Sequence, residues 1–501
     1  MINSTAVDTT DELEELMDDD ISEIKEKSVS GVVSYFLRTA FMQGIGLVAI
    51  IILSAFLSPS DFGIYGFVTQ IIGLLIFFSD VGLAAALVQQ KKNPDNEEYK
   101  VIFTLQWILS LLIVGVILLL IWTGFIQQKV GIAGVWVLLS LAVSFPLATL
   151  KTVSSIKLER KLLFQKLVVP QIFEQIIFYS LLIALAWKGM GVLSYAYAII
   201  ARSIVGVIVM WIIEPWKKIG FLWNTKILKS LLNFGLKFQF NDFLARIKDQ
   251  LFYLILGIFL PLDQFGYIQW AKNWSMYPYN LTVQNVMAIT FPTYSRLQHR
   301  LDILKRAIEK SLFFISLAIF PILVGMSIFI WPLTQVFEKY NKWEPAIFSF
   351  IFFALSIGWA AISTPLVNTL NAIGHINQTL KLMGMWTVLT WVLTPVFIWK
   401  FGFNGVALSA FIISFTSLLS IRMVKKHIPV VIIPQIKSAL LAAILMAIVG
   451  YLGINYWARD IYRLLLGVVI TSGVYGLSIT LLDGKKIFVE IKSLINRPKK
   501  K

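Results

Sequence analysis

The sequence predicts an all-α, polytopic membrane protein with fourteen transmembrane helices. Three observations support this fold class. Hydrophobic residues make up 57% of the 501 residues and charged residues only 14%, which leaves more apolar surface than a water-facing fold can bury. Long apolar runs match the thickness of a bilayer's hydrocarbon core, which a helix of about 20 residues spans. The short loops between these runs are alternately rich and poor in Lys and Arg.

The apolar runs favour helices over barrel strands. Inside lipid, the protein itself must satisfy every backbone N–H and C=O, so only helices and closed barrels cross the bilayer. Barrel strands alternate apolar and polar residues, whereas these runs are continuous. The predicted spans are 31–57, 62–88, 101–123, 131–150, 167–187, 191–213, 231–260, 264–291, 311–331, 346–370, 384–399, 403–421, 438–455 and 462–482.

The distribution of basic residues predicts the orientation. The loops that follow even-numbered spans, together with the two ends of the chain, hold 31 Lys and Arg, whereas the opposite loops hold seven, counting Arg463 at the start of the last span. Because basic loops remain in the cytoplasm, we expect both termini there. The net charge of +16 is then explained by topology and by anionic membrane lipids rather than by nucleic acid.

The two ends of the chain differ from its middle. Residues 1–28 hold ten Asp and Glu against Lys25 and Lys27, so we expect a solvated acidic cytoplasmic tail, with a short amphipathic helix as the alternative. Because a signal peptide begins with basic residues, we expect no cleavage. Residues 483–501 are predicted to form a basic cytoplasmic tail.

An internal repeat divides the spans into two lobes. The segment LSAFLSPSDFG, residues 53–63, resembles LGIFLPLDQFG, residues 256–266, at a constant offset of 203 residues (266 − 63). Six spans separate the two outer turns, so both copies have the same orientation. We therefore predict two parallel six-helix lobes, 29–230 and 231–436, around a central cavity, followed by two more helices in 437–482.

Two basic loops also have the apolar spacing of a helix. Tyr294, Leu297, Leu301, Leu304 and Ile308 recur every three or four residues opposite basic side chains. This pattern predicts a basic amphipathic helix at the level of the lipid headgroups. Residues 156–166 have a similar pattern and predict a second such helix.

Charged residues inside the spans are the first candidate functional residues, because a charge near the bilayer centre costs roughly 3 kcal/mol or more unless it has a partner. The bases are Arg38, Arg202, Lys237, Arg246, Lys248 and Lys272, and the acids are Asp80, Glu174, Asp242 and Asp249. A comparison of depths across helical hairpins predicts two structural ion pairs, Arg38 with Asp80 and Glu174 with Arg202.

Spans seven and eight each carry a polar stripe at helical spacing. The first consists of Gln239, Asp242, Arg246, Asp249 and Tyr253, and the second of Gln269, Asn273, Asn280 and Gln284, with Lys272 beside it. Such stripes avoid lipid. They either contact each other or line a hydrated cavity, and their number of polar groups favours the cavity.

Several chemistries find no support in the sequence. The chain has no Cys, no Gly-rich phosphate loop, and three His residues in separate loops without metal-ligand spacing. The predicted outer loops are short, which leaves little room for a catalytic domain. We therefore expect a protein that is not an enzyme and has no catalytic residues, metal site or cofactor, with Na⁺ or H⁺ coupling as a possibility.

A series of segments resembles a known family in order and spacing. They are FLSPSDFGIYG, FFSDVGLAAALVQQKK, SSIKLERKLLFQK, FGYIQWAKNWSMYPYNLTVQNVMAITFPTYSRLQH, FEKYNKWEPA and NTLNAIGHINQTLKL. Over roughly residues 28–421 the chain resembles the Wzx-type polysaccharide flippases of the polysaccharide transporter family. This family belongs to the multidrug/oligosaccharidyl-lipid/polysaccharide exporter (MOP) superfamily.

The resemblance implies that the protein moves undecaprenyl-diphosphate-linked oligosaccharides across the bacterial cytoplasmic membrane by alternating access, for O-antigen, capsule or exopolysaccharide synthesis. Polysaccharide polymerase or export machinery would be its partner. The substrate-binding role fits Arg38, Arg246, Lys248 and Lys272, with Asn273 and Asn280 beside them. Asp80, Glu174, Asp242 and Asp249 are candidates for ion coupling or structural pairing, the latter including Arg202.

Two other functions stay open at this point. A drug or cation exporter of the same superfamily would favour an anionic cavity, whereas the predicted spans hold two more bases than acids. A saccharide polymerase or membrane glycosyltransferase would need a large outer loop or a metal-binding acidic pair, and the sequence indicates neither.

Overall fold

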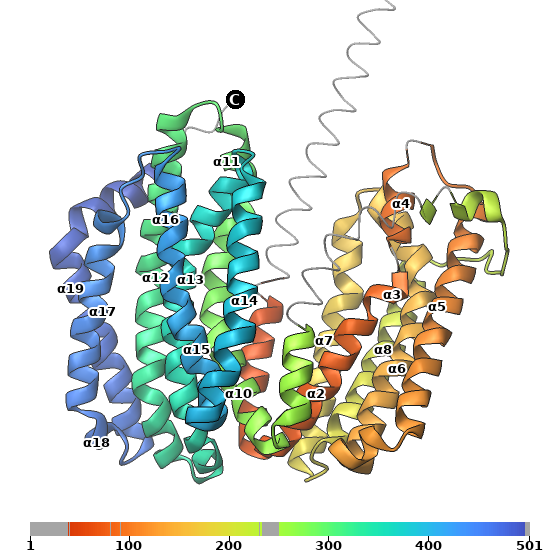
Figure 1. Ribbon diagram of the computed structural model, residues 1–501, viewed down its shortest axis with the longest axis horizontal. Helices are drawn as coiled ribbons and strands as arrows, with labels where there is room; N and C mark the ends of the chain where they lie inside the picture. The colour runs from red at the N-terminus through yellow and green to blue at the C-terminus, as the bar shows by residue number, and fades with distance from the viewer. Residues whose placement is uncertain are drawn as a thin grey trace, which may run out of the picture. The chain divides into compact units, whose positions relative to one another are not determined.

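The computed structural model describes residue 39 and residues 41–80, 82–90, 92–229, 231–232 and 250–495 (Figure 1). These residues form helices and loops, with no strand among them. They fall into two compact units. The first holds the described residues up to Phe56 together with Ile64–Ile258, and the second holds Leu57–Gly63 and the residues from Phe259 onward. The lobe boundaries that the span count predicts stay a prediction.

The helices follow the apolar runs of the sequence. In chain order they are Phe41–Phe56, α2 (Pro59–Leu75), α3 (Phe77–Asp80), α4 (Leu83–Gln89), α5 (Asn96–Trp122), α6 (Phe125–Arg160), α7 (Phe164–Trp187), α8 (Leu193–Ile213), Gln250–Phe259, α10 (Leu262–Tyr279), the π-helix η1 (Asn280–Gln284), α11 (Asn285–Arg296), α12 (Leu301–Val336), the 3₁₀ helix η2 (Glu338–Ala346), α13 (Ile347–Ala372), α14 (Ile376–Phe401), η3 (Gly402–Asn404), α15 (Gly405–Ser414), η4 (Phe415–Ser417), α16 (Leu418–Lys425), α17 (Ile433–Leu452), α18 (Ile454–Trp457) and α19 (Ile461–Ile495).

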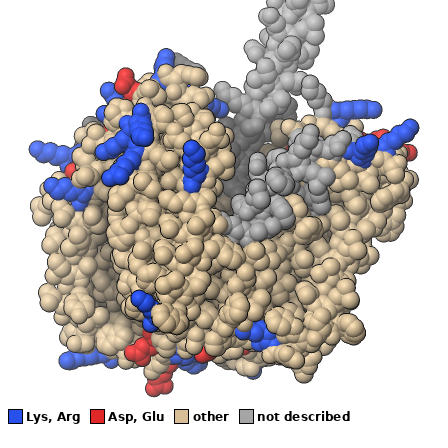
Figure 2. Space-filling model, viewed as in Figure 1, with Lys and Arg blue, Asp and Glu red and all other residues tan. Residues whose placement is uncertain are grey.

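The predicted all-α, multi-pass membrane fold is confirmed. Within the described ranges, nine helical stretches are long and apolar enough to cross a bilayer, and Phe41–Phe56 and Gln250–Phe259 are shorter apolar helices. On α14, Val388, Val392 and Val396 form an exposed stripe at a spacing of four, as a lipid-facing helix requires. Figure 2 shows charged side chains mostly toward the ends of each unit and uncharged residues along its flanks. The total of fourteen spans stays a prediction.

The first unit is built mainly from α5 to α8. Helix α6 packs against α5 and α8, and α8 also packs along α7. A left-handed glycine, Gly131 (φ 68°), bends α6 near its start. A second one, Gly82 (φ 74°), separates α3 from α4, so the predicted span 62–88 is broken into three helices.

The second unit surrounds α12 and α13. Helix α12 packs against α13, α17 and α19, while α13 also packs against α10 and α15. The hydroxyl of Tyr475 in α19 donates to the carbonyl of Leu317 in α12 at 2.8 Å, which ties the last long helix to this core.

The predicted amphipathic helix at residues 294–308 is wrong. Helix α11 ends at Arg296 and α12 begins at Leu301, so the pattern crosses a break. Tyr294, Leu304 and Ile308 are fully buried in a core cluster that also contains residues of α13 and α16. The apolar face therefore packs against neighbouring helices instead of lying among lipid headgroups.

The second predicted amphipathic helix, at residues 156–166, is also wrong. Helix α6 continues to Arg160, and a turn with Leu162 at φ 55° leads into α7. The Arg160 guanidinium donates hydrogen bonds to the backbone carbonyls of Leu87, Val88, Gln90 and Lys92 at 2.6–3.2 Å. This basic side chain caps α4 rather than binding lipid, since the end of a helix leaves carbonyls without intrahelical partners.

The two copies of the internal repeat meet within the second unit. A Cβ atom on Gly63 would overlap the carbonyl of Leu262, and one on Gly266 would overlap the carbonyl of Pro59. These four residues obey the sequence offset of 203 (266 − 63 and 262 − 59). The first turns of α2 and α10 thus cross symmetrically at two glycines, and this geometry supports the repeat that the sequence predicts.

Replacing Arg160 with Lys should expose the backbone around the end of α4. A lysine keeps the charge but lacks the planar group that reaches several carbonyls at once. We expect faster amide hydrogen exchange in residues 83–93, measured by mass spectrometry. The matched control is Lys166→Ala, an exposed base in the first turn of α7. Unchanged exchange in Arg160→Lys would contradict the capping role.

Gly63→Ala and Gly266→Ala should each destabilise the protein, because the added methyl group overlaps backbone atoms rather than a flexible side chain. Overpacking of this kind costs about 1–3 kcal/mol. A lower melting temperature in detergent is the expected result. Gly384→Ala in α14, where a Cβ would meet nothing within 4 Å, is the control and should melt like the original protein. Equal melting of all four proteins would refute the crossing.

Candidate functional site

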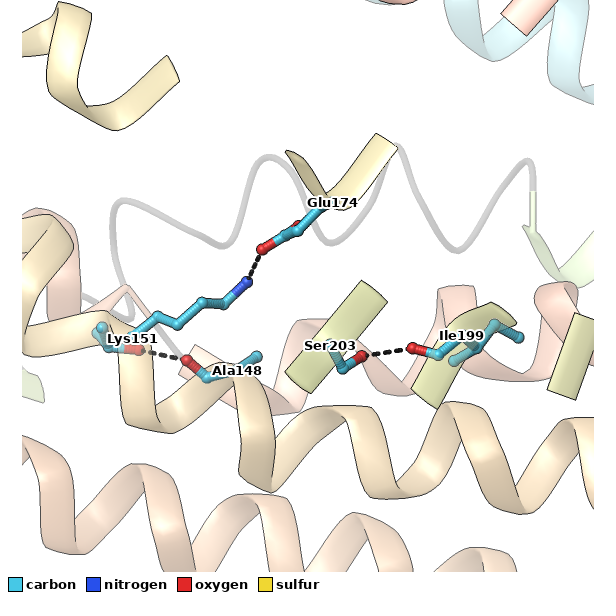
Figure 3. Close-up of polar contacts among 6 residues, drawn as sticks. Ala148, Lys151, Glu174, Ile199 and Ser203 are labelled. Atoms are coloured by element: carbon cyan, nitrogen blue, oxygen red, sulfur yellow. Dashed lines mark hydrogen bonds and ion pairs between the residues drawn. The ribbon is translucent and has the colours of Figure 1, made fainter. Parts of the chain in front are cut away.

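The best-described charged site lies among α6, α7 and α8 of the first unit. Lys151 of α6 forms an ion pair with Glu174 of α7, with their side chains 21% and 23% exposed (Figure 3). Glu174 also lies against Gly206 of α8, where a side chain would overlap its carboxylate. The absence of a side chain at Gly206 therefore makes room for the carboxylate between helices.

The predicted pair of Glu174 with Arg202 is not formed. The guanidinium of Arg202 lies 4.9 Å from the centre of the Phe178 ring, in a cation–π arrangement. Gly206 is four residues after Arg202, so Glu174 contacts α8 one turn away from the predicted partner. The comparison of depths thus placed Glu174 within one helical turn of Arg202, but Lys151 lies closer to Glu174 and forms the ion pair.

Lys151 was missed because α6 extends beyond the predicted end of its span. The sequence contains a signal that could have found this residue. Lys151 lies eleven residues before Leu162 (162 − 151), and Glu174 lies eleven residues after Leu163 (174 − 163). Around the true turn of the α6–α7 hairpin, the two charges are at equal depth.

Aromatic side chains extend this site along α8. Tyr65 of α2 and Tyr195 of α8 are stacked, with ring centres 3.9 Å apart and planes at 11°. Tyr65 and Tyr179 both lie within electrostatic range of Arg202. The hydroxyl of Ser203 instead donates to the Ile199 carbonyl of its own helix at 2.8 Å (Figure 3). The first unit thus combines a cation, an ion pair and phenol groups in an otherwise apolar bundle.

The predicted polar stripe of span eight lies on a helix that a π-helical turn interrupts. Helix α10 passes into a π-helical turn, η1, before α11, and the hydroxyl of Thr282 donates to the Pro278 carbonyl at 2.6 Å. π-Helical turns interrupt regular helices and occur frequently at functional sites. This π-helical turn, Asn280–Gln284, therefore falls inside the candidate binding segment.

The residues of this stripe differ from one another in their exposure. Asn273 and Gln284 are exposed, Lys272 and Asn280 are half-buried, and Gln269 is only 7% exposed. The side chains of Asn273 and Asn280 make no hydrogen bond to any part of the chain that the structure describes. Asn273 therefore presents its amide at the surface and Asn280 exposes part of its side chain, whereas Gln269 faces the interior.

The other candidates cannot be placed. Arg38, Lys237, Gln239, Asp242, Arg246, Lys248 and Asp249 lie outside the described residues, as does the side chain of Asp80. The predicted pair of Arg38 with Asp80, the stripe of span seven and the central cavity stay predictions.

Two of the three His residues are not separate, as the sequence had indicated. His375 follows α13 and His427 follows α16, yet their rings stack with centres 3.8 Å apart. The Gln378 amide lies 3.0 Å from Nε2 of His427. Burial, then the nearby His375 and Lys426, lower the pKa of His427, so the His427 side chain favours the uncharged imidazole.

Comparison with known proteins identifies the family. The family model described as "Polysaccharide biosynthesis protein" matches residues 52–348, more than half of the chain. The chain belongs to this polysaccharide biosynthesis protein family. The family resemblance that the sequence predicts is thereby confirmed.

A curated relative and two solved structures extend the comparison. The succinoglycan biosynthesis transport protein ExoT of Rhizobium meliloti (strain 1021) is 20% identical over 285 residues, which cover 56% of this chain and 57% of ExoT. The lipid II flippase MurJ, in an inward closed conformation, has a TM-score of 0.68 at 16% identity and covers 92% of this chain and all of MurJ. An inward-facing multidrug resistance MATE transporter of the MOP superfamily scores 0.56 at 17% identity, over 77% of this chain and 96% of the transporter.

These structures establish the fold of this family member, and MurJ covers more of the chain than the MATE transporter does. The protein is a multi-pass membrane protein with a transporter fold. Because its aligned part spans 57% of ExoT, what that relative transports does not transfer to this chain without further support.

The ion pair of Lys151 and Glu174 should behave as a coupled unit. Glu174→Gln or Lys151→Met alone leaves an uncompensated charge in a largely apolar bundle and should lower the melting temperature in detergent. The double variant removes both charges and should melt closer to the original protein. The control cycle uses Lys161 and Glu214, 3.0 Å apart, because Lys161 is 55% exposed and its pair should contribute little. Additive effects in the first cycle would show that the two charges are independent.

Proposed function

We propose that this protein flips a saccharide linked to undecaprenyl diphosphate across the bacterial cytoplasmic membrane, by alternating access and without a catalysed chemical step. The family match over residues 52–348 carries this proposal, because it links a multi-pass membrane chain to polysaccharide synthesis. A relative named for succinoglycan transport and a similar fold in a lipid II flippase support the same class of substrate. The product would serve O-antigen, capsule or exopolysaccharide assembly.

The physical problem is the headgroup of such a substrate. A diphosphate and several sugars cross hydrocarbon extremely slowly, while the polyprenyl tail is soluble in it. A hydrated passage with basic and amide side chains solves this problem, since charge-assisted hydrogen bonds suit phosphate and amides suit sugar hydroxyls. We assign the diphosphate to Arg38, Arg246, Lys248 and Lys272, and sugar contacts to Asn273 and Asn280. The exposure of Asn273 and the partial exposure of Asn280 support this assignment.

Coupling to Na⁺ or H⁺ belongs to the proposal through the carboxylates Asp80, Asp242 and Asp249. Glu174 is a weaker candidate, because Lys151 already neutralises it. The excess of basic residues in the loops after even-numbered spans supports an orientation with both termini in the cytoplasm. The polymerase or export machinery that receives the flipped unit would then lie on the outer side.

A drug or cation exporter is the second candidate, because a MATE transporter shares the fold. The family match and the larger coverage by MurJ favour the lipid-linked saccharide. A polymerase or glycosyltransferase is a third candidate, but the sequence indicates neither the large outer loop nor the metal-binding acidic pair that it would need.

Deletion of the gene should stop polysaccharide export and leave a lipid-linked saccharide on the cytoplasmic leaflet, detected by mass spectrometry of extracted lipids. Arg246→Ala or Lys272→Ala should cause the same accumulation at normal membrane abundance, because each removes a proposed diphosphate ligand. The control is Lys188→Ala, an exposed base in the loop between α7 and α8, which the distribution of basic residues predicts to lie on the outer side of the membrane. Normal export in both variants would remove the binding assignment, and drug sensitivity without saccharide accumulation would favour the exporter.

A further inference from the structure

The segment that follows α8 has a regular pattern of exposure although it has no regular secondary structure. Ile219, Phe221 and Trp223 are 45%, 67% and 56% exposed, and the residues between them are half-buried. An extended chain points alternate side chains in opposite directions. The side chains of Ile219, Phe221 and Trp223 therefore lie on the same side of the segment. The ring of Phe221 also packs on α5, with its centre 5.4 Å from that of Phe103 and 6.4 Å from that of Trp107.

This exposure does not result from a loose loop. Trp216, at the start of the segment, is buried in the core of the first unit with its ring 5.1 Å from that of Phe103. Further along, the backbone N–H of Leu222 donates to the hydroxyl of Thr104 in α5 at 2.9 Å. The segment is thus fixed to α5, while Ile219, Phe221 and Trp223 remain 45–67% exposed.

The attachment to α5 gives the depth of the segment. Thr104 lies eight residues after the start of α5 at Asn96, or about 12 Å along the helix axis. Beginning one turn later, Ile108, Leu111 and Leu112 expose apolar side chains as a lipid-facing surface does. The segment with Ile219, Phe221 and Trp223 therefore lies beside the part of α5 where the polar first turns give way to apolar residues.

The surrounding charges are basic. Lys217 and Lys218 precede the apolar residues and are exposed. The adjacent acid, Glu214, is paired with Lys161 at 3.0 Å. At the start of α5, Asp95 and Glu98 satisfy each other's backbone N–H groups in a capping box. Two lysines thus lie beside an apolar patch. Glu214, Asp95 and Glu98 are engaged by other groups, and Glu97 of α5 is the exposed acid nearby.

We propose that residues 215–224 form an interfacial segment that binds an anionic phospholipid. Ile219, Phe221 and Trp223 enter the boundary between headgroups and acyl chains, where amphipathic aromatic side chains are favoured. Lys217 and Lys218 bind the lipid phosphate, since basic side chains are attracted to anionic headgroups. This site anchors the end of α8 at the membrane surface and is independent of the transported substrate.

The position of the segment can be measured with spin labels, because the chain contains no Cys and single-Cys variants need no prior removal. Phe221→Cys and Trp223→Cys are labelled in nanodiscs, and collisions with oxygen and with a water-soluble nickel complex are compared. We expect more oxygen contact and less nickel contact at both positions than at Glu97→Cys, an exposed control in the first turn of α5. Equal nickel contact at all three would overturn insertion.

The lipid itself is tested with the protein in nanodiscs of phosphatidylcholine and phosphatidylglycerol in equal parts. Native mass spectrometry after release should detect bound phosphatidylglycerol, and Lys217→Gln combined with Lys218→Gln should reduce it about tenfold. The control pair is Lys425→Gln with Lys426→Gln, two exposed lysines at the end of α16, which should retain it. Equal retention in both pairs, or retention of phosphatidylcholine instead, would overturn the proposed site. The site would also be overturned if the spin labels at positions 221 and 223 were exposed to water and the segment captured a protein partner.

Discussion

Lipid offers no hydrogen-bond partner, so a polar group inside a membrane protein depends on a partner within the chain or on a hydrated cavity. Many hydroxyl groups of this protein meet this constraint locally. Ser140 donates to the Trp136 carbonyl, Thr149 to that of Phe145 and Ser203 to that of Ile199, each one turn back along its own helix. Charges cannot be satisfied in this way. A charge requires a partner on a second helix at the same depth, so an ion pair indicates which helices are neighbours.

The charges show what a sequence can predict and where that prediction fails. The positions of the apolar runs were found because bilayer thickness sets their length, and α7 and α8 end at the predicted Trp187 and Ile213. The partner of Glu174 was missed because it depends on the residue at which the hairpin turns. Composition indicated a loop after Leu150, whereas α6 continues for almost three more turns to Arg160. Because the predicted end of α6 was too early, the comparison of depths paired Glu174 with Arg202 and left out Lys151.

The two basic loops illustrate a different limit. An apolar residue every three or four positions specifies one face of a helix, but it does not specify whether lipid or protein covers that face. Tyr294 and Ile308 could equally have lain among headgroups, and only the positions of α13 and α16 decide that they are core residues. Arg160 presents the same ambiguity, because a loop arginine that binds backbone carbonyls looks in sequence like one that binds lipid.

In the interfacial segment, residues 215–224, the situation is the opposite, because the proposed partner of the basic residues is lipid and not protein. The basic residues at 157–161 are engaged within the protein, whereas Lys217 and Lys218, which the span count treated only as topology signals, lie beside exposed aromatic residues. A basic residue near an end of a membrane helix has three possible partners: backbone carbonyls, an acid or a lipid phosphate. The first two require a neighbouring chain segment at the right depth. In residues 215–224 the acid just before the segment, Glu214, is engaged by Lys161 and large apolar side chains are exposed, and this combination favours the lipid phosphate as the partner of Lys217 and Lys218.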